Sequence, residues 1–156
     1  MTTSISNLDR YKTDLKRLIE TGQALAFSMQ LDHAPAEFRE QVTAQVGTDK
    51  ADALIKNLPS FRGKYESWYS ESSALIKQIL PDRLEDFRRH YQIPKGRKDV
   101  DHGNYVIEDF MQRSVIRFGG TVKVDGSAAI FRFQSQVQIL EACATRFESS
   151  LFDIRQ

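Results

Sequence analysis

The sequence contains only one cysteine, Cys143, among 156 residues. A single cysteine cannot form an intramolecular disulfide or a cysteine-rich zinc site, so packing alone must stabilise the fold, as suits a reducing compartment. A chain of this length can bury a sufficient core within one domain. We therefore expect a single domain over 1–156 and a cytoplasmic location.

The sequence also lacks an excess of charge of either sign, and it lacks long apolar runs. Lys and Arg total 22 and Asp and Glu total 21, which gives a formal net charge of +1. The chain therefore has no overall field that attracts nucleic acid or anionic lipid, and an electrostatic partner must be bound by a local patch. No signal-peptide core is present, and no stretch approaches the roughly 20 apolar residues that span a bilayer. We expect no membrane insertion.

Signatures of catalysis are also missing. The sequence has no phosphate-binding loop, serine-hydrolase elbow or zinc signature. Cys143 has no base nearby in the sequence, so we expect it to be a small packed residue. Asp99, Asp101 and His102 are of metal-ligand type, but one short run without a second ligand set does not predict a metal site. We expect no cofactor and no metal, and the sequence favours a protein that is not an enzyme.

Three long segments carry apolar or small residues at alternating intervals of three and four, which predicts helices with one packing seam each. They cover 6–33, 59–80 and 127 to near the C-terminus. Gly22 lies on the first seam, where the missing side chain allows a second backbone to come close. The seams are formed by Leu8, Tyr11, Leu15, Leu18, Gly22, Leu25 and Met29, by Phe61, Tyr65, Trp68, Ser72, Leu75 and Ile79, and by Ile130, Phe133, Val137, Leu140, Ala144, Phe147, Leu151 and Ile154.

Shorter elements connect the long segments. Thr48 and Ser127 are candidate helix caps, and Gly119-Gly120 between two alternating runs predicts a tight β-hairpin over 114–125. Short helices are expected at 36–46, 49–57, 82–91 and 104–113, and an exposed loop at 93–103. The predicted fold is mainly α: a helical bundle of three long heptad-spaced helices plus short helices and one small β-hairpin.

The last seam has a competing interpretation, in which it forms an interface with a second copy or another domain. We favour packing within the chain. No Gly, Asn or Pro ends this seam, which predicts that the domain is the N-terminal part of a longer chain.

The densest basic segment, 83–98, has Phe87 and Tyr91 interleaved among its cations, and such a patch can hold phosphates while the rings stack on bases. The hairpin adds Arg113, Arg117 and Lys123, and can act as a wing on a nucleic-acid backbone. The candidate nucleic-acid-binding residues are Arg88, Arg89, Lys95, Arg97, Lys98, Arg117 and Lys123. The neutral overall charge favours a simpler interpretation, a solvated helix face beside a hairpin that covers the open end of the bundle. In that interpretation the buried side of the hairpin consists of Ile116, Phe118, Val122 and Val124.

Arg97 and His102 are five residues apart, a separation also seen in the arginine-histidine motif of HEPN-type ribonucleases. There the histidine would act as acid or base, and the arginine would stabilise charge on the phosphate. That motif belongs on a helix, whereas these residues lie in a predicted loop, so we favour a chance match. They are weak catalytic candidates.

Three stretches, YESWYSESSALIKQILPDRLEDF (65–87), GNYVIEDFMQ (103–112) and RFESSLFDIRQ (146–156), resemble the N-terminal region of a group of longer, poorly characterised bacterial proteins. The resemblance implies that the last helix leads into a second, HEPN-type helical domain, and that the protein is tied to mobile elements or phage defence. The catalytic residues of that domain have no counterpart here. The present segment would then sense, scaffold or dimerise rather than cut.

Three functional hypotheses follow. The first is a non-catalytic helical interaction module whose loop at 93–103 and hairpin face a protein partner or a second copy. The second is a nucleic-acid-binding protein, which requires its seven candidate cations to converge on one surface. The third is a HEPN-like ribonuclease, which requires Arg97 and His102 on one wall of a cleft.

Overall fold

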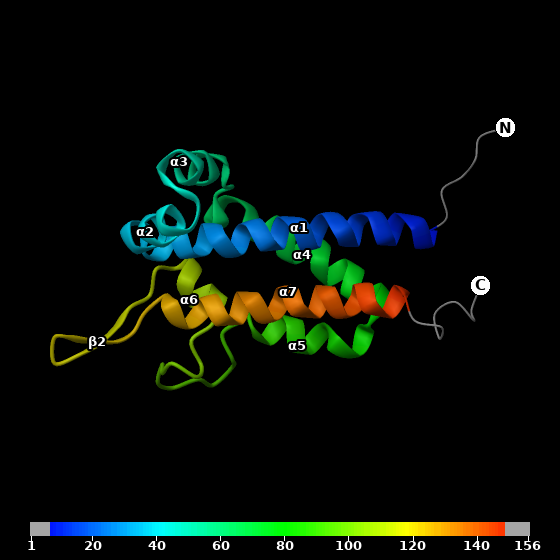
Figure 1. The fold of residues 1–156 in the computed structure, drawn as a ribbon. Helices are drawn as coiled ribbons and strands as arrows, with labels where there is room; N and C mark the ends of the chain where they lie inside the picture. The colour runs from blue at the N-terminus through cyan, green and yellow to red at the C-terminus, as the bar shows by residue number, and fades with distance from the viewer. Residues whose placement is uncertain (1–6, 149–156) are drawn as a thin grey trace.

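The computed structural model describes residues 7–148 of the chain. Three long helices, α1 (Asn7–His33), α4 (Phe61–Ile79) and α7 (Ser127–Phe147), pack side by side as a bundle (Figure 1). The predicted fold class is confirmed, because the described chain is mainly helical with one small two-stranded antiparallel hairpin. The first helix also has the predicted limits to within one residue.

The core lies between α1, α4 and α7, which all pack against one another, and α7 also packs against α5 (Leu84–Arg89) and α6 (Ile107–Met111). Its seam residues Phe133, Val137, Leu140 and Phe147 are buried. The buried face is wider than the seam, and also includes Ala128, Ala129, Gln136, Ile139 and Cys143. The described part of the last seam therefore faces the interior of the chain, while Leu151 and Ile154 lie outside the described residues.

Aromatic rings fill the space between α4 and α7. Tyr65 is fully buried and contacts rings on α4 and α7, with centroid distances of 5.1 Å to Phe61 and 5.8 Å to Phe133. Its hydroxyl donates to Gln136 Oε1 at 2.8 Å, and Gln136 Nε2 donates to the carbonyl of Phe87 at 2.9 Å. This chain of hydrogen bonds gives the buried side chains of Tyr65 and Gln136 their partners.

Two glycines allow close packing around α7. A Cβ atom at Gly22 would lie 3.0 Å from Val137 Cγ2 and 3.1 Å from Trp68 Cζ2, as its place on the seam predicts. At Gly126, just before α7, a Cβ atom would lie 2.8 Å from Cδ2 of Phe110. Since real Cβ contacts are essentially never this short, a side chain at Gly126 would push α6 away from α7.

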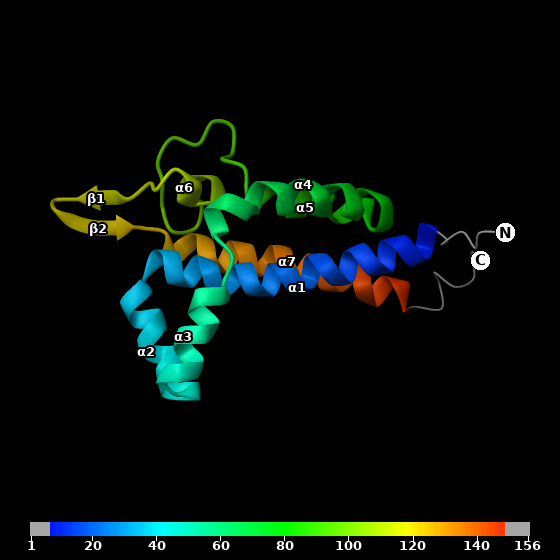
Figure 2. The ribbon, with the colours of Figure 1, turned by 90° about the horizontal axis from the view of Figure 1, so that it is seen from above.

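The pair α2 (Pro35–Val46) and α3 (Thr48–Asn57) stands away from the bundle beside the end of α1 (Figure 2). The prediction that Thr48 caps α3 is wrong, because Thr48 is already helical and Gly47, with φ of 87°, occupies the cap position. Ser127 is likewise inside α7 rather than its cap. Gly126 occupies the cap position, and the carboxylate of Asp125 before it accepts from the Ser127 amide at 3.0 Å and from its hydroxyl at 2.7 Å.

Between α4 and α7 the chain forms a short 3₁₀ turn, η1 (Pro81–Arg83), then α5 (Leu84–Arg89), a loop, and α6 (Ile107–Met111). α6 is shorter than the predicted helix at 104–113. It cannot begin earlier, because Val106 is extended at φ −124° and ψ 175°. It ends where Arg113 adopts a φ of 58°, a left-handed conformation that terminates helices.

The hairpin consists of β1 (Ile116–Phe118) and β2 (Thr121–Val124), joined through Gly119-Gly120 as predicted, and extends past the ends of the helices (Figure 2). The predicted covering role is wrong for its outer half. Phe118 is 82% exposed and Val122 is also exposed, whereas Val124 is buried. A bulge between Ile116 and Arg117 breaks the alternation, so that Phe118 does not share a face with Val122 and Val124.

Candidate functional site

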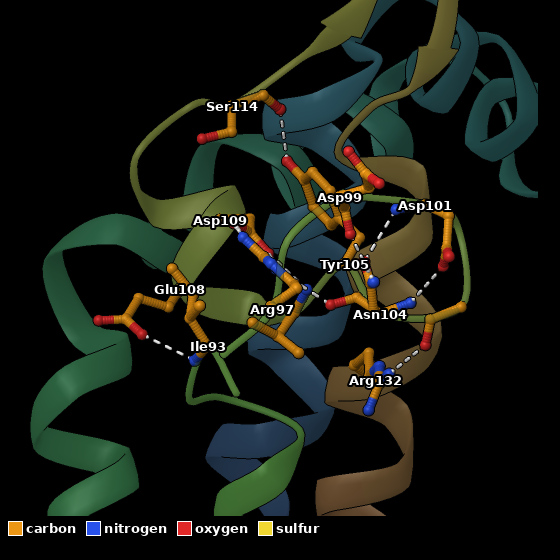
Figure 3. A network of polar contacts seen from close by, with 12 residues as sticks. Ile93, Arg97, Asp99, Asp101, Asn104, Tyr105, Glu108, Asp109, Ser114 and Arg132 are labelled. Atoms are coloured by element: carbon orange, nitrogen blue, oxygen red, sulfur yellow. Dashed lines mark hydrogen bonds and ion pairs between the residues drawn. The ribbon is translucent and has the colours of Figure 1, made fainter. Parts of the chain in front are cut away.

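The loop that follows α5 is anchored by a buried ion pair (Figure 3). Arg97 Nη1 lies 2.8 Å from Asp109 Oδ2, and Nη2 lies 2.9 Å from Oδ1, while Nη1 also donates to the Asn104 carbonyl at 3.1 Å. The side chains are only 11% and 3% exposed, respectively. Asp109 Oδ2 accepts from the Val106 amide as well, at 2.8 Å. The hydrogen bonds that Arg97 donates to Asp109 raise the pKa of Arg97, so this guanidinium is a fixed structural cation.

The middle of the loop is a closed turn. The Asp101 amide donates to Asn104 Oδ1 at 2.8 Å, and the Asn104 amide donates back to Asp101 Oδ1 at 2.9 Å. Asn104 Nδ2 donates to the Asp99 carbonyl at 2.8 Å, and Arg132 on α7 donates to the Gly103 carbonyl. The loop is therefore held by side chains rather than by regular secondary structure.

The two weak catalytic candidates do not form a site together. The guanidinium of Arg97 is directed at Asp109 (Figure 3), whereas His102 is exposed in the turn. His102 lies close enough to Asp125 that its charge helps to lower the pKa of that carboxyl, after the larger contribution of the Ser127 hydrogen bonds. Within residues 7–148 no hydrogen bond or ion pair joins Arg97 to His102.

Three of the predicted nucleic-acid-binding residues do come together. Arg88, Arg89 and Lys95 line a groove of about 660 Å³ between α5 and the loop. Glu85 and Glu108 line the same groove, and Arg89 is already paired with Asp86. The carboxylates weaken the attraction of this groove for a polyanion.

The remaining predicted cations lie elsewhere. Arg97 is buried in its ion pair, and Lys98 is exposed on the loop. On the hairpin, Arg117 lines a separate cavity with Val122, whereas Lys123, one residue further, points to the opposite face of the strand. The seven cations therefore do not line one common groove, which the nucleic-acid hypothesis requires.

The cavity beneath the hairpin has a volume of about 310 Å³ and lies between the hairpin, the end of α1, and α6. Arg62 on α4 forms one wall and is held by three hydrogen bonds: Nε lies 2.9 Å from Asp32 Oδ2, and Nη1 donates to the carbonyls of Phe110 at 2.8 Å and Met111 at 3.1 Å. Arg113 and Arg117 also line the cavity. Among the described residues, neither guanidinium group has a hydrogen bond or an ion pair.

Sequence reasoning placed Arg113 and Arg117 on the hairpin but did not predict their cavity. Arg62, His33 and Asp125, which also line it, belong to helix ends and a turn far apart in the chain. No local sequence pattern joins these segments, and α4 shows that a helix of this chain can end without a residue in the left-handed conformation.

Cys143 and His90 are titratable groups away from these sites, and their surroundings shift the pKa of each away from neutral pH. Burial raises the pKa of Cys143 to about 11, so its thiol stays protonated at neutral pH, as expected of a packed residue. Burial, followed by the charges of Arg132 and Arg89 and opposed by Asp86, lowers the pKa of His90 to about 4. Neither residue is poised for nucleophilic or acid-base catalysis at neutral pH.

Within residues 7–148, no group of three or more His, Cys, Asp or Glu side chains is placed to hold a metal ion. No helix of this part of the chain is long and apolar enough to cross a bilayer. Comparison of the chain with protein-family models, curated proteins and solved structures finds no match.

Proposed function

We propose that this chain is a non-catalytic interaction module that binds a protein partner through its β-hairpin. The observation that carries the proposal is the exposure of large apolar side chains on an element that projects from the bundle (Figure 2). Phe118 is 82% exposed, and Val122 on β2 and Val115 just before β1 are exposed as well. Aromatic side chains of this kind are enriched in the energetic centres of protein interfaces.

The rest of the molecule supports a scaffold role. The bundle is a tightly packed support, and the loop beside α6 is held by the Arg97–Asp109 pair and by the Asp101–Asn104 turn. A rigid support lowers the entropic cost of presenting a binding element. In a longer protein of the kind that the resemblance implies, such a module would sense or scaffold rather than cut. The link to phage defence or mobile elements stays a prediction.

The experiment places a photo-crosslinking amino acid at position 118 in cells and at Phe131 on α7 as a control, since Phe131 is 72% exposed but lies outside the hairpin. A protein captured only from position 118 is then purified and titrated against the parent chain, Phe118→Ser and Phe131→Ser. The proposal expects loss of binding in Phe118→Ser alone. Equal binding by both variants would contradict it, and light scattering over a concentration series identifies a second copy as the partner.

A second candidate, nucleic-acid binding, is favoured only by the groove that Arg88, Arg89 and Lys95 share. Its test is a titration of single-stranded RNA at increasing salt with the parent and with Arg88→Gln. Binding that weakens steeply with salt, and that loses part of this slope in the variant, supports the groove as a phosphate site. Binding with no salt dependence ends this candidate.

A further inference from the structure

We infer that the cavity beneath the hairpin binds the carboxylate of an acidic, partly apolar peptide segment of the partner, through Arg113 and Arg117. This inference rests on the proposed function and specifies the chemistry of the ligand. The cavity, at about 310 Å³, has room for one side chain or one small anion rather than for a folded element. Its occupant is therefore a single group carried by a larger partner.

The charges of the cavity are unbalanced in a specific way. Asp32 is neutralised by Arg62 at 2.9 Å, and Arg62 also caps the last carbonyls of α6. Asp125 accepts two hydrogen bonds from Ser127 and lies 3.8 Å from His33. Once these partners are assigned, Arg113 and Arg117 remain as lining residues whose guanidinium groups have no anion in the described part of the chain. Guanidinium groups bind carboxylates in a bidentate fork, so an external carboxylate can neutralise the two unpaired arginines.

Arg113 occupies a backbone position that is unfavourable for arginine. Its φ of 58° is the only positive φ of a non-glycine residue among the described residues. The position follows α6 in a Schellman motif, in which the Arg113 amide donates to Phe110 and the Ser114 amide donates to Asp109, both at 3.0 Å. Glycine satisfies this motif without strain. When a residue keeps a strained backbone conformation beside a cavity that it lines, a binding role for its side chain is a reason to keep that residue.

The rim of the cavity distinguishes a peptide from a nucleic acid. Val115 and Val122 line it and are exposed, so the ligand must bring apolar groups as well as an anion. Lys123 points to the other face of the hairpin, so Arg113 and Arg117 are the only two unpaired cations that the described residues place along this cavity. A phosphodiester backbone needs several cations along one track. An acidic residue flanked by aliphatic side chains matches both the arginines and the valines.

The test selects short peptides from a random display library on the full chain and measures their affinities for the parent and four variants by fluorescence anisotropy. We expect enriched peptides that combine Asp or Glu with aliphatic residues. Their binding should weaken at least about tenfold in Arg113→Gln and in Arg117→Gln. The matched control Lys123→Gln, on the opposite face of the same strand, should stay within about twofold, and Val122→Ser should weaken binding.

The possible results separate this inference from the proposed function. Peptides that depend on Val122 but carry no acid, or that bind Arg113→Gln normally, overturn the carboxylate site and leave the hairpin as a docking surface. Peptides indifferent to all four variants overturn the carboxylate site, while the proposed function is decided separately by Phe118→Ser. A single-stranded RNA that binds more tightly than any selected peptide, and that loses binding in Arg113→Gln, would assign the cavity to phosphate instead. Circular dichroism of each variant confirms that the fold is retained.

Discussion

Breaking the buried pair of Arg97 and Asp109 is expected to cost more stability than breaking any exposed ion pair in the described part of the chain. Substitution Arg97→Ala removes two hydrogen bonds to Asp109 and one to the Asn104 carbonyl. It leaves a carboxylate whose side chain is 3% exposed, with the Val106 amide as its remaining donor. Breaking a buried pair in this way costs about 3–5 kcal/mol, out of a total stability of about 5–15 kcal/mol for a typical domain.

Urea unfolding followed by circular dichroism measures this loss of unfolding free energy directly. In thermal unfolding, a loss of about 3–5 kcal/mol corresponds to a fall of roughly 6–20 °C in Tm for a domain of this size. The matched control is Arg89→Ala, which also breaks an arginine-aspartate pair, but one in which the arginine side chain is 68% exposed. The control should lose no more than about 1 kcal/mol. Equal stability losses in the two variants would refute the assignment of Arg97 as a buried structural cation.

This prediction also bears on the ribonuclease hypothesis. Because Arg97→Ala is expected to weaken the fold, loss of RNA cleavage in that variant carries no information about catalysis. His102 is exposed, and His102→Ala should therefore unfold at the same urea concentration as the parent. Cleavage of RNA by the purified parent chain, abolished in His102→Ala, is the result that would revive the hypothesis.

Three further variants probe the backbone and pH dependence. Arg113→Gly relieves a left-handed φ, and thermal unfolding should show it to be more stable than the parent by about 0.5–1 kcal/mol; a loss of stability would contradict the strain argument. Gly126→Ala should lower the free energy of unfolding in urea by about 1–3 kcal/mol, because the added methyl group overpacks against Phe110. An unchanged urea midpoint would contradict this close contact between Gly126 and Phe110. The pKa of His90 is lowered from 6.5 to about 4, so the unfolded chain takes up its proton first. Stability should fall as pH decreases from 6.5 to 4, by about 1–2 kcal/mol after allowance for solvent screening, and this slope should flatten in His90→Gln.

The long helices could be predicted from the sequence because their seams repeat over many turns. α1 matches its predicted span, and Gly22 lies against Trp68 and Val137 as its seam position implies. Helix packing of this kind depends on periodicity, which a single sequence displays directly. The caps were less predictable, since the cap position of α7 is Gly126, one residue before the predicted Ser127.

The candidate sites depend on contacts that periodicity does not encode. Arg97 and Asp109 are twelve residues apart, and they meet only because the intervening turn closes through Asn104. The bulge at Ile116 and Arg117 changes which side of the hairpin carries Phe118. In both cases local backbone geometry decides the outcome, and no hydrophobic pattern specifies it.

The two ends of α6 show why charge alone does not identify a binding residue. Arg97 and Arg113 are both near this short helix, and both belong to basic stretches of the sequence. Arg97 is neutralised by a buried carboxylate, so its substitution should be detected as lost stability. Arg113 has a strained backbone and, within residues 7–148, no anionic partner, so Arg113→Gly should raise stability while removing binding. A variant that is more stable but no longer binds is the result expected when an unfavourable conformation is kept for a ligand rather than for the fold.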